Sequence, residues 1–226
     1  MITFHRYNEP FFDKNSMILE RIKYAREKLP YANLVTSSNS DYLDAEYVHK
    51  NRDAGLDSLY CQCQTEGYSE KPLEVIKENI LNINKRIGNF KGKFAIDETS
   101  CVFVTVGSGF KSLTIQAKYF IKTGFNRGGI IGNVTTKGRE GVCYQPLISF
   151  TIDFNGKATM CSNTVSYYKA HEDYVIGDCA SNTIFEIYSS EKAIEFRKRL
   201  LSAKRQSICK DCSCSYEKYA RQYNLA

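Results

Sequence analysis

The stretch that decides the fold runs from Cys143 to Cys161 and reads CYQPLISFTIDFNGKATMC. Its centre, Phe154-Asn155-Gly156, combines residues that favour tight turns. Apolar residues on both sides predict two short strands, at 147–153 and 157–161, joined as a hairpin. Such a hairpin would bring its two terminal cysteines close together, because one precedes the first strand and the other ends the second.

A second cysteine pair, Cys209 and Cys212, follows in the motif CKDC. This spacing lets two thiolates bind one metal centre from a single turn. Together with Cys143 and Cys161, the pair predicts a four-cysteine site, in which Cys214 is the alternative to Cys212 as fourth ligand. Four thiolates suit either a [4Fe–4S] cluster or structural zinc. Zinc ribbons usually carry two close pairs, whereas this chain has one, so the spacing favours iron–sulfur.

Composition sets the broad class of the protein. The chain has 226 residues, of which 42% are hydrophobic and 25% charged, as in an ordinary globular protein. Its sequence has no apolar run of membrane-spanning length and no secretory signal at its start, so we expect a cytoplasmic protein without a membrane partner. In that compartment nine cysteines favour metal ligation over disulfides, with scattered buried thiols as the simpler explanation.

Positive charge is concentrated at the C-terminal end of the chain. From Ser190 to Ala226 there are nine Lys or Arg and four Asp or Glu, which supply most of the net charge of +6. A solvated helix face is the favoured interpretation, and a docking surface for an acidic partner is the alternative. Because no motif combines aromatic and basic residues for recognition, we do not expect nucleic acid as a partner.

The first half of the chain alternates short apolar runs with amphipathic stretches. We expect strands at 2–4, 32–35, 56–63, 102–106 and 129–131, and helices at 15–28, 41–52, 72–87 and 112–122. Two further helices are expected at 183–188 and 191–201. The β-α alternation predicts a parallel sheet with helices outside it, and ligands at the carboxyl ends of its strands. The pattern changes near residue 140, which divides the chain into domains at 1–140 and 141–226.

The cysteine segment resembles a known family. The run Cys143-x12-Gly156-x4-Cys161 is followed by YVIGD, NTIFEIYSS, a helix with Arg197, and CKDC. This order, over about residues 141–214, is similar to the single-cluster version of the SPASM domain, the auxiliary cluster domain of many radical S-adenosylmethionine (SAM) enzymes. The resemblance implies one auxiliary [4Fe–4S] cluster. Cys179 is expected only to pack in the fold.

The opening FHRYNEPFFD (4–13) resembles the second strand of a radical SAM core. That strand ends in a Gly-Gly-Glu-Pro segment that binds the methionine end of SAM, and the matching residues here are Tyr7-Asn8-Glu9-Pro10. LVTSSNSDYL (34–43) resembles the third-strand element. The resemblance therefore implies a SAM site containing Asn8, Glu9, Asn39 and Gln62. The simpler roles are an exposed loop carboxylate for Glu9 and a barrel-lining side chain for Gln62.

The reactive centre of that family, a Cys-x3-Cys-x2-Cys loop after the first strand, has no match in this chain. The resemblance thus implies an α/β fold: a partial (β/α) radical SAM barrel lacking its first β-α unit, followed by a small α+β SPASM-like iron–sulfur domain. We expect a fragment of a longer enzyme, with a natural truncation as the alternative. In either case the strand at 2–4 would lie at an open sheet edge.

The function expected from these patterns is iron–sulfur binding by a SPASM-domain protein that resembles a radical SAM enzyme. Such enzymes generate a 5′-deoxyadenosyl radical and act on a peptide or small-molecule substrate with an electron donor. The alternative is a non-catalytic zinc- or cluster-binding module with a basic docking surface. Whether this chain is itself an enzyme stays open, and we predict no catalytic residue. Of the histidines, His5 lies beside the predicted SAM loop, whereas His171, in the polar run HED, is expected in a solvated loop.

Overall fold

The computed structural model describes residues 1–6, 8–12, 17–64, 71–132, 134, 141–202, 207–210, 212 and 221. The chain divides into two compact units, Met1–Thr123 and Gly124–Ala226. The domain boundary predicted near residue 140 lies outside the described residues, and the division by contacts falls earlier. Among the described residues, none of the helices combines the length and apolar character that crossing a membrane requires.

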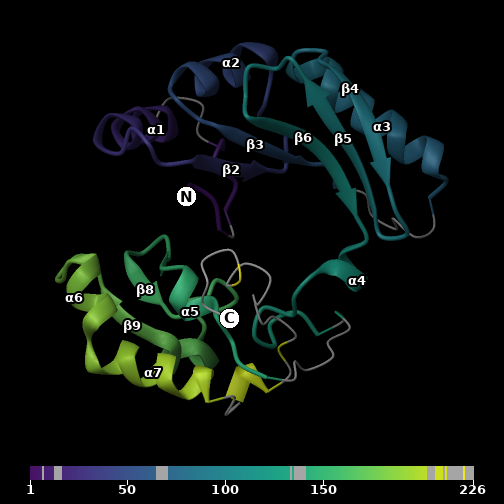
Figure 1. The fold of residues 1–226 in the computed structure, drawn as a ribbon. Helices are drawn as coiled ribbons and strands as arrows, with labels where there is room; N and C mark the ends of the chain where they lie inside the picture. Colours follow the sequence, from purple (N-terminus) through teal and green to yellow (C-terminus); the bar gives the residue numbers. More distant parts are fainter. Residues whose placement is uncertain are drawn as a thin grey trace. The chain divides into compact units, whose positions relative to one another are not determined.

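The first unit is built on a six-stranded sheet in the order β1-β2-β3-β6-β5-β4 (Figure 1). Its strands are β1 (Ile2–Thr3), β2 (Leu34–Ser38), β3 (Ser58–Gln62), β4 (Lys91–Ile96), β5 (Ser100–Val106) and β6 (Ser112–Lys118). β1, β2, β3 and β6 run parallel, whereas β4 and β5 pair antiparallel. β1 lies at one edge of the sheet, as predicted for the strand at 2–4, and β4 lies at the other.

Helices cover one face of this sheet (Figure 1). They are α1 (Met17–Lys28), α2 (Ala45–Asp53) and α3 (Leu73–Ile87). The short helix α4 (Phe120–Thr123) follows β6 and lies beyond the end of that strand (Figure 1). The N-cap of α2 is Asp44, whose side chain accepts a hydrogen bond from Tyr47 N at 2.8 Å, so this helix begins later than the predicted start at residue 41. Apolar residues from the helices and the strands beneath them form one buried core, which includes Ile22, Val48, Ile80, Leu59 and Ile115.

Two predictions for this unit are wrong, namely the helix at 112–122 and a sheet that is parallel throughout. The predicted helix at 112–122 is β6 followed by the four-residue α4. Its buried apolar residues Leu113, Ile115 and Ala117 recur every second position, the period of a strand. The strand predicted at 102–106 is confirmed within β5, but it pairs antiparallel with β4, a strand that was not predicted. In the second unit, the predicted strand at 129–131 adopts turn and coil conformations instead.

The opposite face of the sheet carries a row of polar side chains. Tyr60 of β3 pairs with Thr114 of β6, and Gln62 pairs with Gln116. Because successive side chains of a strand point to opposite faces, these four residues lie on the face away from the buried Cys61 and Ile115. The predicted site residue Gln62 is therefore the last residue of β3 and belongs to this polar row.

The second unit contains a three-stranded antiparallel sheet of β7 (Thr151–Ile152), β8 (Lys157–Thr159) and β9 (Val175–Asp178). The predicted hairpin is confirmed, since Asp153 N donates to Lys157 O at 2.8 Å and Gly156 has the positive φ of 80° that the turn needs. Its first strand is shorter than predicted, because residues 145–148 form the short helix α5 (Gln145–Ile148), with Pro146 in its first turn. β9, which holds the YVIGD segment, was not predicted as a strand.

The helices of this unit are the 3-10 helix η1 (Lys169–Tyr174), α6 (Ile184–Ser189), α7 (Glu191–Leu201) and the short 3-10 helix η2 (Ser207–Cys209). α6 and α7 match the predicted helices. Thr183 and Glu186 form a capping box at the start of α6. Ile187 of α6 packs so closely on Gly177 that a Cβ there would lie 2.7 Å from Ile187 Cγ1. This contact explains the glycine in the β9 segment.

Candidate functional site

Cys161 lies two residues beyond β8, in a tight loop that holds both its carbonyl and its sulfur. Thr164 donates to Cys161 O from its backbone N at 3.1 Å and from its hydroxyl at 2.7 Å. Asn163 N donates to Cys161 Sγ at 3.3 Å. An N–H directed at a sulfur favours the thiolate form, which is the form that binds metals.

Cys143 is buried and is tied to two other segments of the second unit. Its backbone N donates to Leu200 O, near the end of α7, at 3.2 Å. Gln145, two residues later, donates from Nε2 to Ser162 Oγ at 3.4 Å. Since Ser162 directly follows Cys161, this contact joins the segments that carry the first two predicted ligands.

Cys209 and Cys212 form a turn, in which Cys212 N donates to Cys209 O at 3.4 Å. Ile208 and Cys209 pack against the apolar core of the second unit, a cluster that includes Ala158 and Phe196. The turn is therefore anchored to the same core as the hairpin. The alternative ligand Cys214 lies outside the described residues.

The four predicted cysteines act on one another electrostatically. Burial raises the pKa of the Cys161 thiol far above its ordinary value, and the charges of Cys143, Cys212 and Cys209 raise it further, while the Asn163 N–H lowers it. All three cysteines therefore contribute to the electrostatic surroundings of the Cys161 sulfur. Among the described residues, no group of three His, Cys, Asp or Glu side chains is arranged so that it could hold a metal ion.

The donor set nevertheless fits the group that the family resemblance implies. Iron–sulfur clusters are held by cysteine thiolates, and the ligand candidates here are four cysteines, one of which already receives an N–H···S hydrogen bond. Cys179 instead packs against the apolar core of its unit, as predicted. Its thiol pKa is raised by burial and by the neighbouring Asp178 carboxylate.

A second cluster of predicted residues lies at the carboxyl ends of β1 and β2. Glu9 Oε2 accepts a hydrogen bond from Asn39 N at 2.7 Å, and Oε1 accepts one from Ser38 Oγ at 2.9 Å and one from Phe11 N at 3.0 Å. The structure thus brings Glu9 and Asn39 together. Asn8 makes a local turn, in which its Oδ1 accepts from Arg6 N at 3.2 Å.

Two residues that were not predicted from the sequence, Arg86 and Ser40, lie next to this cluster and hydrogen-bond to each other. Arg86, in the last turn of α3, donates to Ser40 O at 2.7 Å. Ser40 has a φ of 73°, which is unusual for a residue with a side chain. Burial of the Cys61 thiol raises its pKa to about 12. No local sequence pattern marks Arg86, because its partner lies 46 residues away.

The two histidines near these sites differ from each other in their surroundings. His5 Nδ1 accepts from Ser37 N at 2.8 Å, and burial lowers the pKa of His5. His171 was predicted in a solvated loop, but it is fully buried, so that prediction is wrong. Its ring lies between Val165 N and Gly128 O, which provide buried polar partners that the run HED does not reveal.

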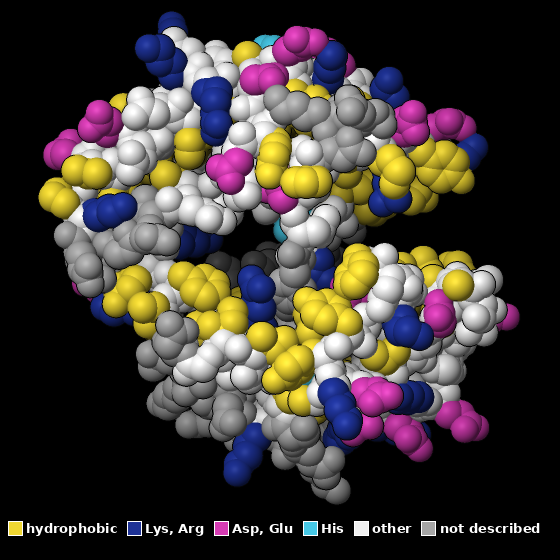
Figure 2. Space-filling view, turned by 180° about the vertical axis from the view of Figure 1, so that it is seen from behind, with side chains coloured by type: hydrophobic (Ala, Val, Ile, Leu, Met, Phe, Trp, Pro, Cys, Tyr) yellow, Lys and Arg dark blue, Asp and Glu magenta, His cyan; other side chains and the backbone are white. Residues whose placement is uncertain are grey.

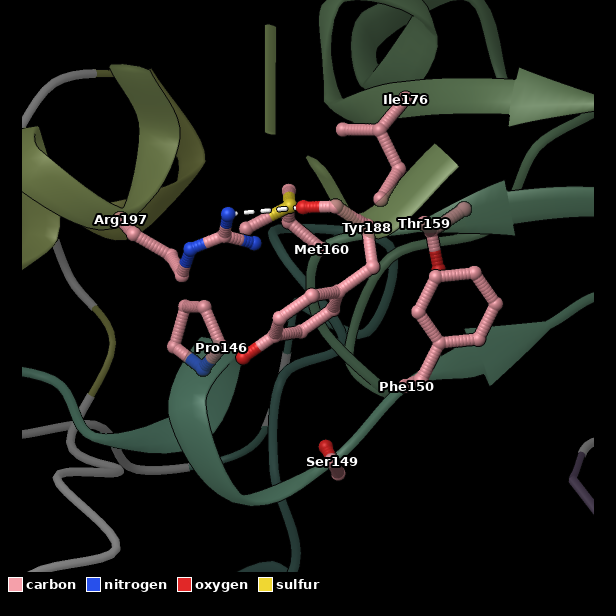
Figure 3. A pocket seen from close by; sticks show the side chains of 8 residues that line it. All are labelled: Pro146, Ser149, Phe150, Thr159, Met160, Ile176, Tyr188 and Arg197. Atoms are coloured by element: carbon pink, nitrogen blue, oxygen red, sulfur yellow. Dashed lines mark hydrogen bonds between the residues drawn. The ribbon is translucent and has the colours of Figure 1, made fainter. Parts of the chain in front are cut away.

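A small, mainly apolar pocket lies in the second unit, beside the residue that precedes Cys161 (Figure 3). Figure 3 shows the Arg197 guanidinium against the Tyr188 ring, with its carbon 4.1 Å from the ring centre, and a hydrogen bond of 2.7 Å to Tyr188 O. The remaining lining residues are Pro146, Ser149, Phe150, Thr159, Met160 and Ile176. Arg197, which the resemblance had marked, thus joins α7 to the end of α6.

Surface charge was expected to be basic toward the C-terminus. On the face that Figure 2 shows, the described Lys and Arg side chains are interspersed with Asp and Glu. Helix α7 itself carries Glu191 and Glu195 beside Lys192, Lys198 and Arg199. This mixture fits a solvated helix face.

Comparison with known proteins gives one family match and related solved structures. Residues 143–213 match the model of SPASM, an iron–sulfur cluster-binding domain. No curated protein matches the chain. The crystal structure of BtrN in complex with AdoMet and 2-DOIA is similar, with a TM-score of 0.66 and 18% identity over 93% of this chain and 71% of that chain.

The structure of selenomethionine BtrN in an open conformation is also similar, with a TM-score of 0.57 and 16% identity over 96% of this chain and 74% of that chain. At these identities the likeness concerns the fold. The chain therefore has a mixed α/β fold with a parallel-strand sheet that resembles BtrN, and a segment that matches an iron–sulfur-binding domain.

Proposed function

From the relationship to the radical SAM/SPASM family that the SPASM match and the BtrN-like fold support, we propose that this chain binds one auxiliary [4Fe–4S] cluster. Cys143, Cys161, Cys209 and Cys212 are its ligands. In this proposal residues 141–226 form a SPASM-like domain, and residues 1–140 correspond to a radical SAM barrel without its first β-α unit.

One observation carries the proposal, namely that the Gln145–Ser162 hydrogen bond joins the Cys143 and Cys161 segments, while Cys209 packs against the core of the same unit. The Asn163 N–H is already directed at the Cys161 sulfur and would stabilise it as a thiolate ligand. A bound cluster would accept an electron or anchor a substrate at this end of the second unit. The loop after β8 positions the sulfur of Cys161, and the turn from Cys209 to Cys212 positions the other pair.

We further propose that Glu9 and Asn39, with Asn8 and Gln62, bind the methionine end of SAM. The solved complex of BtrN with AdoMet supports this proposal. The Glu9 carboxylate is fixed by Ser38 and Asn39, and a carboxylate has about four acceptor positions, so it retains capacity for an ammonium group. The proposal for these residues concerns SAM binding alone, because none of them belongs to a Cys-x3-Cys-x2-Cys motif. The partners that we propose for this chain are a peptide or small-molecule substrate and an electron donor.

Anaerobic reconstitution with iron and sulfide tests the cluster. We expect about four irons and four sulfides per chain, with a broad absorption band in the visible range. Cys161→Ser should lose the cluster, whereas the matched control Cys179→Ser should retain it. Stoichiometric zinc without sulfide would overturn the proposal in favour of a non-catalytic zinc module.

Calorimetric titration of the reconstituted chain with SAM tests the second site. Glu9→Gln removes the carboxylate charge and should weaken SAM binding by at least about tenfold, as expected for loss of one charge-assisted hydrogen bond. The control Ser38→Ala disturbs the same network but keeps the carboxylate, so it should bind SAM nearly as the wild type does. Equal weakening in both variants would contradict a direct role for the Glu9 charge.

A further inference from the structure

His171 uses both of its ring nitrogens although it is completely buried in η1. Val165 N donates to Nδ1 at 3.0 Å. Because a backbone N–H can only donate, Nδ1 must present a lone pair, and in the neutral ring the hydrogen therefore lies on Nε2. Nε2 is 3.0 Å from Gly128 O, which can only accept. The edge-on ring of Tyr168, 5.0 Å away, completes the enclosure.

The first of these bonds reaches the Cys161 loop. Val165 is the residue after Thr164, which donates to Cys161 O, and lies two residues after Asn163, which donates to Cys161 Sγ. Three consecutive residues of this loop thus have their backbone N–H groups committed, two to Cys161 and one to His171. His171 holds Val165 at the end of this loop. The position of the Asn163 N–H, which faces the Cys161 sulfur, therefore depends on His171.

The second bond reaches the turn at Cys209. Gly128 has a φ of 65°, and a Cβ at this position would lie 2.7 Å from His171 Nε2 and 3.1 Å from Ile208 Cδ1. Gly128 therefore lies against both the histidine ring and the side chain of Ile208. Because Ile208 immediately precedes Cys209, a shift of this segment would be transmitted to the turn that carries two of the proposed ligands.

We propose that His171 is a positioning residue that fixes the Cys161 loop and the Cys209 turn relative to each other. The inference rests on the proposed cluster site, and it assigns His171 no contact with the cluster. Groups that orient ligands in this way, and hydrogen bonds to cluster sulfurs, set the potential and spectrum of a metal centre. A change at His171 should therefore alter the electronic properties of the bound cluster as well as the stability of the unit.

Three substitutions separate the two bonds. In His171→Asn, the side-chain oxygen lies as far from the backbone as Nδ1 and can still accept from Val165 N, but the link to Gly128 is lost. In His171→Gln, the terminal amide lies about as far out as Nε2 and can still donate to Gly128 O. His171→Phe fills the space and makes neither bond. The matched control is Ile187→Val, which removes a methyl group from the apolar cluster of the same unit at a residue that packs closely on Gly177 of β9.

Two measurements are made on the full chain. In the cluster-free protein, hydrogen exchange of the Val165 amide should be at least about tenfold faster in His171→Phe than in the wild type, with protection restored in His171→Asn. In the reconstituted protein, the electron paramagnetic resonance spectrum and the midpoint potential of the reduced cluster should change in His171→Phe and return toward the wild type in His171→Asn. Ile187→Val should leave both measurements unchanged.

If His171→Phe is less stable but has the wild-type spectrum and potential, His171 is an ordinary core residue and the proposal is overturned. If His171→Phe does not fold, His171→Asn and His171→Gln decide, because unchanged spectra in both would also overturn it. A wild-type chain that takes up no iron contradicts the proposed function instead. In that case unchanged Val165 exchange in His171→Asn and loss of protection in His171→Gln would still support the link to the Cys161 loop, and the reverse pattern would refute it.

Discussion

The carboxylate of Glu9 accepts a hydrogen bond of 2.7 Å from the backbone N–H of Asn39. This bond joins the segment after β1 to the end of β2, which are 30 residues apart in sequence. The same carboxylate accepts from Ser38 and Phe11. Glu9 therefore connects the segment after β1 to the carboxyl end of β2 through hydrogen bonds.

Glu9→Gln should lower the free energy of unfolding by about 1–3 kcal/mol, since an amide cannot accept on both sides and would leave one buried donor without a partner. Urea denaturation followed by circular dichroism measures this change. Glu78→Gln, an exposed carboxylate on α3, is the control and should stay within about 0.5 kcal/mol of the wild type. Equal stability of the two variants would show that the Glu9 network contributes nothing to folding.

The left-handed backbone of Ser40 gives a prediction of the opposite sign. With φ of 73°, Ser40 is strained in a way that glycine is not. Ser40→Gly should therefore raise the free energy of unfolding by about 1 kcal/mol. The backbone contacts of this residue, Ser40 N to Ser38 Oγ and Arg86 to Ser40 O, are kept in the variant.

Ser40→Ala is the partner variant that separates strain from the hydroxyl group. It keeps the side-chain carbon that causes the strain but removes the Ser40 hydroxyl, which is buried without a hydrogen-bond partner among the described residues. Thermal unfolding should place Ser40→Gly above both Ser40→Ala and the wild type. A glycine variant less stable than the alanine variant would mean that strain at this position is not what limits stability.

The sequence predicted those parts of the structure that local periodicity determines. Helix α3 follows from apolar residues at helical spacing, and Gly88 ends it with a φ of 140°. The β7–β8 hairpin follows from its turn residues. In each of these cases the deciding residues lie within about one turn or one hairpin of each other.

Other features depend on contacts between distant residues and could not be predicted locally. Segment 112–118 is a strand because β3 and β5 pair with it on both sides, which overrides the helical interpretation of its sequence. His171 is buried because Val165 and Gly128, the latter 43 residues away, provide its partners. A polar run in the sequence does not reveal such partners, so the histidine was predicted at the surface.

Asp57 makes stability depend on pH. Burial opposes its ionisation, but hydrogen bonds from Lys111, Leu34 N and Arg26 outweigh burial and lower the pKa of Asp57. A carboxyl with a lowered folded-state pKa stabilises the fold above its unfolded pKa of about 3.9, and this contribution is lost as the pH falls through the folded value.

The free energy of unfolding should therefore fall as the pH drops from about 5 toward 2, and this slope should be shallower in Asp57→Asn. Urea denaturation across this pH range provides the measurement. Glu78→Gln should keep the wild-type slope, because that carboxylate is exposed. If Asp57→Asn retains the full slope, the acid sensitivity arises from other carboxylates.

The raised pKa of Cys161 predicts its reactivity before and after cluster loading. In the metal-free chain, burial and the neighbouring thiols disfavour the thiolate, which is the nucleophile in alkylation. We expect iodoacetamide to modify Cys161 about tenfold more slowly than Cys179, because Cys179 is partly exposed and no neighbouring thiol among the described residues raises its pKa. Peptide mass spectrometry measures both rates, and in urea the two cysteines should react alike.

After loading with iron and sulfide, Cys143, Cys161, Cys209 and Cys212 should all be protected from iodoacetamide, while Cys179 still reacts. Protection of Cys179, or continued reaction of any of the four, would contradict the proposed ligand set.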